Sequence, residues 1–157
     1  MNKTQINEKA DYLIKKSKKA GAEDVDVVYV ENTNIDVGCR LKKIEKLERS
    51  ESNDLGLRFI KNKKQVIVSS NDLSNKSLEE LVYKASNMVK AVPKDPYCSI
   101  AEKKDLIKKI PNLNILENKE PSINSLKNKV IEAEKAGLNV NGVTNSEGSE
   151  IGWNKSK

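Results

Sequence analysis

Three acidic residues, Glu48, Glu51 and Asp54, lie close together in the sequence near the expected end of a strand. Two carboxylates can serve as a general acid and a general base when their surroundings shift their pKa values apart. No neighbouring residue in the sequence is suited to produce such a shift, and carboxylates at strand ends are usually solvated. We therefore expect no catalytic role for these three residues.

A second group with reactive atoms is Asn145-Ser146-Glu147-Gly148, where a hydroxyl and a carboxylate are neighbours. Serine and asparagine at turns usually form hydrogen bonds with the backbone instead. The glycines at positions 56, 142, 148 and 152 match neither fingerprint of a phosphate-binding loop. These patterns indicate turns rather than a site for a substrate or a nucleotide.

The 157 residues include no histidine. This excludes a Ser-His-Asp triad, an imidazole general base and a zinc site of the H-E-x-x-H type. The two cysteines, Cys39 and Cys98, lack the spacing of metal ligands, and we expect free thiols rather than a disulfide. The residue types therefore predict no catalytic, cofactor-binding or metal-binding position in this chain.

The formal net charge is +6 and the isoelectric point is about 9.2, which raises the possibility of nucleic-acid binding. However, most lysines are mixed with acidic residues, and the densest basic cluster is Lys15-Lys16 with Lys18-Lys19. Nucleic-acid sites usually add arginines and exposed aromatic side chains, and both are scarce here. We interpret most of the charge as solvated surface, with a basic nucleic-acid-binding module as the alternative.

The sequence has no run of 18 apolar residues, so it predicts no transmembrane helix. The first eight residues lack the apolar core of a signal peptide. We therefore predict a cytoplasmic protein, and the length is that of one ordinary domain with a largely aliphatic core.

The clearest secondary structure lies between Glu48 and Val92. Two apolar runs, Leu55–Ile60 and Gln65–Ser69, flank a polar connection and predict a β-hairpin. Ser74 then caps a helix that ends at Pro93, because proline lacks the N–H that the helix needs. The apolar residues of this helix share one face: Leu78, Leu81, Val82, Ala85, Met88, Val89 and Val92.

The residues before this hairpin predict a helix and three extended segments. Thr4 to Ala20 reads as an amphipathic helix, with Thr4 as its N-cap and Gly21 after its last turn. A strand over 24–31, a turn over 31–34 and an alternating strand over 35–41 follow. Residues 41–50 fit either a helix or a strand; we choose a turn at Lys42-Lys43 and a strand that returns to Ser52.

The residues after the hairpin and its helix give weaker signals. Pro93–Tyr97 reads as a rigid linker, and 101–119 has room for a short strand or a helical turn without deciding between them. A third helix is expected from Ser122 to Gly137, with Ile123, Leu126, Val130 and Ala133 on one face. A strand-like run over 138–143, a turn over 144–148 and a strand beginning at Ser149 complete the chain. The predicted fold is α+β, a mainly antiparallel sheet of hairpins covered by helices on one face.

Four pieces of sequence together are more specific than any single motif. They are Glu48–Ser52 with Leu55–Phe59, Val68–Ser74 leading into Leu78–Val82, Pro93–Tyr97 and Gly142–Gly148. In this order and spacing they resemble the N-terminal domain of the PmbA/TldD family, and the PmbA branch more than the TldD branch. The resemblance extends over essentially the whole chain.

This resemblance implies a role in a metalloprotease system for proteolysis and peptide maturation, in the cytoplasm. It implies an N-terminal α+β domain over 1–138, with 139–157 beginning the next β segment of a C-terminal domain that is absent here. It also implies a TldD-like partner in a heterodimer, with zinc bound only by that partner. We therefore expect a truncated PmbA-type subunit without activity of its own, acting through a TldD-like subunit or the missing C-terminal half.

Under this resemblance, the remaining role of the chain is contact with a partner or a peptide. The hairpin strands are the candidates, because an extended segment can add to the edge of a sheet. The residues concerned are Leu55, Leu57, Arg58, Phe59, Val66 and Val68. A third hypothesis is a non-functional remnant of a split gene, which predicts an exposed apolar surface.

Overall fold

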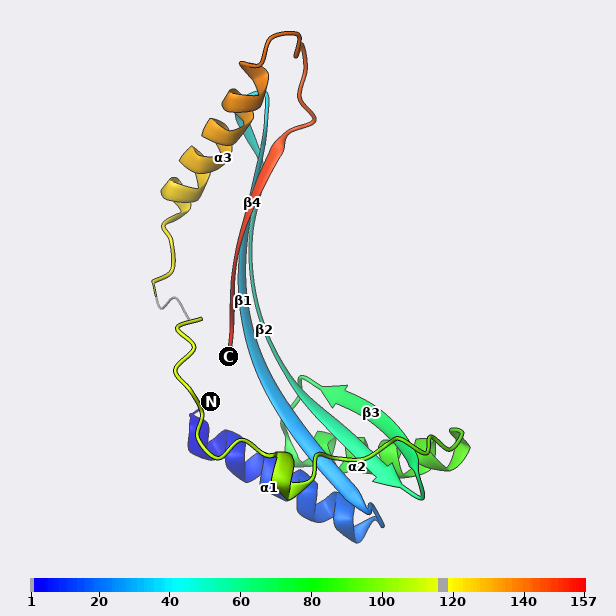
Figure 1. Ribbon diagram of the computed structural model, residues 1–157. Helices are drawn as coiled ribbons and strands as arrows, with labels where there is room; N and C mark the ends of the chain where they lie inside the picture. The colour runs from blue at the N-terminus through cyan, green and yellow to red at the C-terminus, as the bar shows by residue number, and fades with distance from the viewer. Residues whose placement is uncertain (1, 116–118) are drawn as a thin grey trace. The chain divides into compact units, whose positions relative to one another are not determined.

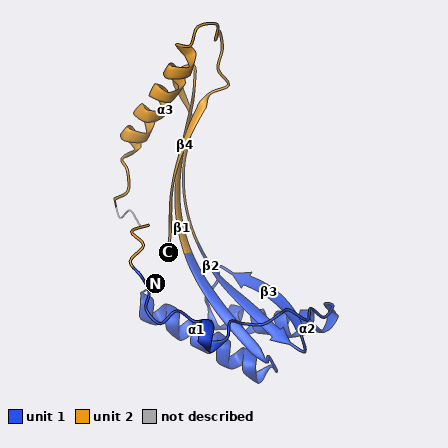
Figure 2. Cartoon of the chain, viewed as in Figure 1, with its two compact units in different colours: residues 1–30, 53–111 blue, residues 31–52, 112–157 orange. Residues whose placement is uncertain are grey.

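The computed structural model describes residues 2–115 and 119–157, and it confirms the α+β class. A four-stranded antiparallel sheet has the strand order β3-β2-β1-β4 (Figure 1). The elements are α1 (Lys3–Lys19), β1 (Asp24–Arg40), β2 (Lys43–Lys61), β3 (Lys64–Ser70), α2 (Asn75–Ala91), the 3₁₀ turn η1 (Lys103–Asp105), α3 (Ile123–Leu138) and β4 (Ser149–Ser156). The chain divides into two compact units, residues 1–30 with 53–111 and residues 31–52 with 112–157 (Figure 2).

The two longest strands, β1 and β2, contribute residues to both units. The turn predicted over 31–34 is wrong, because these residues continue β1 without a break. Their asparagines form hydrogen bonds across strands instead of closing a turn: Asn34 accepts from Asn154 and donates to Ser50 Oγ at 3.4 Å. Amide side chains that suit a turn are therefore used here to connect neighbouring strands.

The choice of a strand over residues 43–52 is confirmed, since β2 is continuous from Lys43 to Lys61. The turn before it lies one residue earlier than the predicted Lys42-Lys43: it consists of Leu41 and Lys42, whose φ angles are 48° and 64°. The predicted hairpin of β2 and β3 is also confirmed, with Leu55 opposite Ser70 and Lys61 opposite Lys64. Asn62 and Lys63 close it with φ angles of 53° and 58°, as a two-residue hairpin turn requires.

The first unit has its core between one face of the sheet and the helices α1 and α2. Alternate residues of β2 and β3 face this core because side chains on a strand point to opposite faces in turn. The fully or nearly fully buried residues of this core include Leu13 of α1, Leu55, Leu57 and Phe59 of β2, Val66 and Val68 of β3, and Leu78, Leu81, Val82, Ala85 and Val89 of α2. Met88, predicted on the apolar face of α2, is instead 40% exposed.

Both predicted helices of this unit are confirmed, but one cap differs. Ser74 caps α2, accepting a hydrogen bond from Ser77 N, and the helix ends before Pro93 as expected. The cap of α1 is Asn2 rather than Thr4: Asn2 Oδ1 accepts from Gln5 N at 2.9 Å, and Gln5 Oε1 accepts from Asn2 N at 3.1 Å. This reciprocal pair satisfies two backbone donors, so the helix begins earlier than predicted.

The second unit has a smaller core beneath α3. Leu126 and Val130 of α3 pack on Ile35, Val37 and Cys39 of β1, with Ile151 and Trp153 of β4 beside them. The predicted helix is confirmed, with Ser122 as its cap, but Ile123 and Ala133 of its predicted apolar face are exposed, and Glu134 is buried. β4 pairs with β1, placing Ser149 opposite Cys39 and Ser156 opposite Asn32.

The strand predicted over 138–143 is wrong. Leu138 ends α3, Asn139 has helical backbone angles, and a turn follows in which Gly142 has a φ of 88°. The β-branched valines there suggested a strand, but within the described residues they have no neighbouring strand to pair with. For residues 101–119 the sequence left open a short strand or a helical turn. The structure has one 3₁₀ turn there, η1, and residues 116–118 of this range lie outside the described residues.

Replacing Leu57 by alanine tests the packing of the first unit. Leu57 is fully buried, so Leu57→Ala is expected to lower the free energy of unfolding by about 2–5 kcal/mol in urea denaturation. Ile67 of β3 is 70% exposed, so the matched control Ile67→Ala is expected to cost less than about 0.5 kcal/mol. Equal losses for the two variants would contradict the assignment of the buried face.

Candidate partner-binding site

The hairpin residues proposed for partner contact lie mostly in the core. Leu55, Leu57 and Phe59 are fully buried, and Val66 and Val68 are each only 6% exposed. Their side chains therefore face α1 and α2, and a partner that bound this hairpin would have to use the backbone of β3. β3 lies at one edge of the sheet, which leaves this mode of strand addition as a prediction.

Arg58, the sixth of these residues, points to the opposite face of the sheet. Its Nε donates to Asp26 Oδ1 at 3.1 Å and to Oδ2 at 3.2 Å, and its Nη2 also reaches Oδ2. This hydrogen bonding raises the pKa of Arg58 further above its usual range. The guanidinium thus already binds a carboxylate of its own sheet.

The acidic group near the middle of β2 is solvated. Glu48, Glu51 and Asp54 are all exposed, and Glu51 forms an ion pair with Arg49. Arg49 also donates to both carboxylate oxygens of Glu120, at 3.4 Å and 3.3 Å. These ion pairs connect β2 with the residues that precede α3 in the second unit.

Residues 144–148, predicted as a turn, form an irregular loop before β4, and the polar groups of this loop bind the backbone. Ser146 Oγ accepts from Gly148 N at 2.9 Å, and Arg40 Nε donates to the carbonyl of Ser146 at 3.4 Å. Gly148 has a φ of 118°, and a Cβ there would come within 2.6 Å of the Cys39 carbonyl oxygen. Only glycine fits this position, since both the backbone angle and the space exclude a side chain.

Sequence reasoning missed Glu134, a buried carboxylate whose two oxygens both accept backbone hydrogen bonds. Its Oε1 accepts from Leu41 N at 2.8 Å, and its Oε2 accepts from Lys42 N at 2.7 Å. Both residues lie in the β1–β2 turn, so this single side chain anchors the turn to α3. The available signal was its position four residues after Val130, on the apolar face of the helix.

The surroundings of Glu134 stabilise its charged form. Hydrogen bonds from the Lys42 and Leu41 backbone, from Ser146 and from the Cys39 thiol lower the pKa of Glu134 below its usual value, although desolvation opposes this. Burial and the nearby Glu134 charge raise the pKa of the Cys39 thiol. Cys39 is therefore a poor nucleophile at neutral pH. Both Cys39 and Cys98 are buried free thiols, as predicted.

A different surface is exposed and apolar. Residues 102–110, which we call the η1 segment, contain η1 and no other regular structure. Leu106, Ile107 and Ile110 are 55%, 68% and 84% exposed. Further along, Leu113 and Ile115 are also exposed. Apolar side chains clustered in this way commonly mark a surface for another molecule.

Comparison with known proteins assigns this fold. Residues 25–89 match the family model for PmbA/TldA metallopeptidase domain 1. This part of the chain is therefore similar to domain 1 of the PmbA/TldD family. One curated relative, the metalloprotease PmbA of Escherichia coli O157:H7, is 27% identical over 131 residues, which is 83% of this chain and 29% of that protein.

Solved structures show the same fold. A candidate modulator of DNA gyrase from Bacteroides thetaiotaomicron matches 99% of this chain and 36% of its own, with a TM-score of 0.75 and 20% identity. TldE from Thermococcus kodakarensis matches 94% of this chain and 34% of its own, with a TM-score of 0.68 and 18% identity. The chain thus spans about a third of the length of the relatives it matches.

The described residues of this chain do not suit a zinc ion. The sequence supplies no imidazole, and Cys39 is buried against Val130 with a raised thiol pKa. Among residues 2–115 and 119–157, no three side chains of His, Cys, Asp or Glu come together in a way that could hold a metal ion. No helix within these residues is long and apolar enough to cross a membrane.

The Glu134 contacts predict a stability that depends on pH. Because the pKa of Glu134 is lowered on folding, its stabilising effect is complete above about pH 4.5 and is lost as the pH falls through the folded-state pKa. Glu134→Gln should therefore lower the urea midpoint at pH 7, with a difference from the native chain that shrinks under acid conditions. Glu132→Gln, on the exposed side of α3, is the control and should leave the midpoint unchanged. A constant difference at every pH would contradict a role for the Glu134 charge.

Proposed function

We propose that this chain supplies the N-terminal domain of a PmbA-type subunit in a TldD/PmbA-type metalloprotease system. The observation that carries the proposal is the match of residues 25–89 to metallopeptidase domain 1 in a chain without histidine. The curated relative that aligns over most of the chain is named a metalloprotease PmbA. This supports the PmbA branch, for which the sequence resemblance also argues.

In this proposal the chain takes no part in breaking peptide bonds. A TldD-like partner binds the zinc ion, and zinc in such a partner would act as a Lewis acid that polarises a peptide carbonyl and activates water. Support comes from the side chains of this chain that could bind a metal. The chain has no imidazole, and its two thiols lie in separate buried positions. The contribution of this chain is then to bind and orient the catalytic subunit.

The extent of the functional unit is part of the same proposal. The relatives are about three times as long as this chain, which supports a further β-rich domain, on the same polypeptide or on another. The boundary predicted after residue 138 stays a prediction, and β4 pairs with β1 in the sheet of the present chain. A cytoplasmic location is likewise kept as a prediction.

A proteolysis assay tests whether the chain is inactive alone and raises the activity of a TldD-like subunit. The purified chain, a purified TldD-like subunit and their mixture are each given fluorescently labelled casein and zinc. We expect no hydrolysis by the chain alone, and at least about tenfold faster hydrolysis by the mixture than by the TldD-like subunit, because the two act as one enzyme. Removal of zinc with a chelator should abolish the activity of the mixture.

Two results would contradict the proposal. Chelator-sensitive hydrolysis by the chain alone, in a preparation free of other proteases, would make it catalytic. Equal rates for the TldD-like subunit with and without the chain would remove its proposed role. The Leu57→Ala variant, whose core is weakened, serves as a control because its effect on the rate should follow its folded fraction.

A further inference from the structure

The η1 segment, residues 102–110, has little structure of its own to hold it in place. Its hydrogen bonds are local: Asp105 N donates to Glu102 O at 2.9 Å, and Leu106 N donates to Lys103 O at 3.4 Å. It belongs to the long connection between α2 and α3, where η1 is the sole regular element among the described residues. Long connections of this kind in compact proteins often have a binding role.

The apolar side chains of this segment are concentrated rather than scattered. Leu106, Ile107 and Ile110 fall within five residues, and each exposes more than half of its surface. Single exposed aliphatic residues are normal on a protein surface, but three in such a short stretch are not. Burial of these side chains against another molecule would therefore be strongly favourable.

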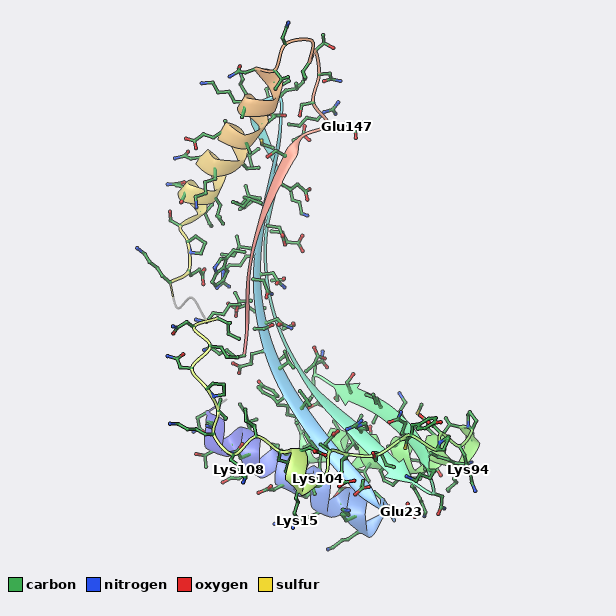
Figure 3. The ribbon with its side chains drawn as sticks, in the orientation of Figure 1. Lys15, Glu23, Lys94, Lys104, Lys108 and Glu147 are labelled. Atoms are coloured by element: carbon green, nitrogen blue, oxygen red, sulfur yellow. The ribbon has the colours of Figure 1, made fainter. Side chains whose placement is uncertain are left out.

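The charge of the η1 segment indicates what kind of surface would bind it. Four lysines, at 103, 104, 108 and 109, stand against Glu102 and Asp105, which leaves a net charge of +2. Lys104 bonds Glu102 at 2.9 Å, but both side chains are more than two-thirds exposed, so this pair is weak. Figure 3 shows Lys104 and Lys108 along this part of the chain. A complementary surface has an apolar groove with an acidic rim.

The same features favour a protein over other partners. Segments that bind a membrane surface are usually amphipathic helices, and the helical part of this segment is a three-residue 3₁₀ turn. Nucleic acid offers mainly phosphates, which give exposed isoleucines no partner, and the segment contains no arginine. An acidic, apolar protein surface satisfies both the lysines and the aliphatic side chains.

We propose that the η1 segment is the docking element for the TldD-like subunit. Leu106, Ile107 and Ile110 enter an apolar groove on that subunit, and the flanking lysines face acidic residues around it. This inference rests on the proposed function, since it assigns the contact surface of the same partnership.

Isothermal titration of the whole chain with a purified TldD-like subunit tests this surface. Two double variants remove its features: Ile107→Ser with Ile110→Ser, and Lys104→Glu with Lys108→Glu. Two controls make matched changes elsewhere on the first unit: Tyr83→Ser, at a side chain that is 72% exposed on α2, and Lys76→Glu with Lys84→Glu, at exposed lysines of the same helix. All four changes are at exposed positions, and circular dichroism checks that the variants fold.

We expect the dissociation constant to rise at least about tenfold for both variants of the η1 segment and to stay within about twofold for both controls. Added salt should weaken binding of the native chain, and it should weaken binding of the lysine-to-glutamate variant less.

The outcomes separate this inference from the function on which it rests. If the TldD-like subunit binds all variants with equal affinity, the η1 segment is not the docking element, while the proposed partnership stands. If the native chain does not bind that subunit at all, the proposed function itself fails. Binding to vesicles with anionic lipid or to RNA that the variants lose, without a matching loss toward the TldD-like subunit, would also overturn the inference.

Discussion

Backbone pairing between β1 and β2 is the constraint on which the rest of the structure depends. The two strands, of 17 and 19 residues, are much longer than usual strands, and each contributes residues to both compact units. In the first unit, β2 pairs with β3 and packs under α1 and α2; in the second, β1 pairs with β4 and packs under α3. Each unit therefore obtains its core by covering part of the same pair of strands.

Local sequence patterns predicted the elements whose stabilising contacts are themselves local or regularly spaced. The alternation of Leu55, Leu57 and Phe59 and the spacing of Leu78, Leu81, Val82 and Ala85 identified the hairpin and α2. Contacts between distant residues account for the errors. Asn32 and Asn34 look like turn residues, but they bond to Ser156 and Asn154, more than 100 residues away. Glu134 looks like a surface residue, but it binds the backbone of a turn 92 residues earlier.

The candidate site was harder to predict than the fold. The hairpin residues singled out for partner contact are apolar because they form a core, and apolarity alone does not distinguish a core from an interface. The η1 segment has the same residue types without a predicted element, so only its exposure in the structure separates it from a buried strand. The similarity to the PmbA/TldD family rests on sequence and fold together, while the role of the domain is a proposal about a larger assembly.

Hydrogen–deuterium exchange on the chain, alone and mixed with a TldD-like subunit, tests the central claim that this domain works by docking a catalytic partner. In the free chain, amides of the η1 segment should exchange rapidly, while those of paired β1 and β2 exchange slowly. In the mixture, the account predicts at least about tenfold slower exchange in the η1 segment, with little change in the buried hairpin of β2 and β3. Unchanged exchange along the whole chain in the presence of saturating TldD-like subunit would contradict it.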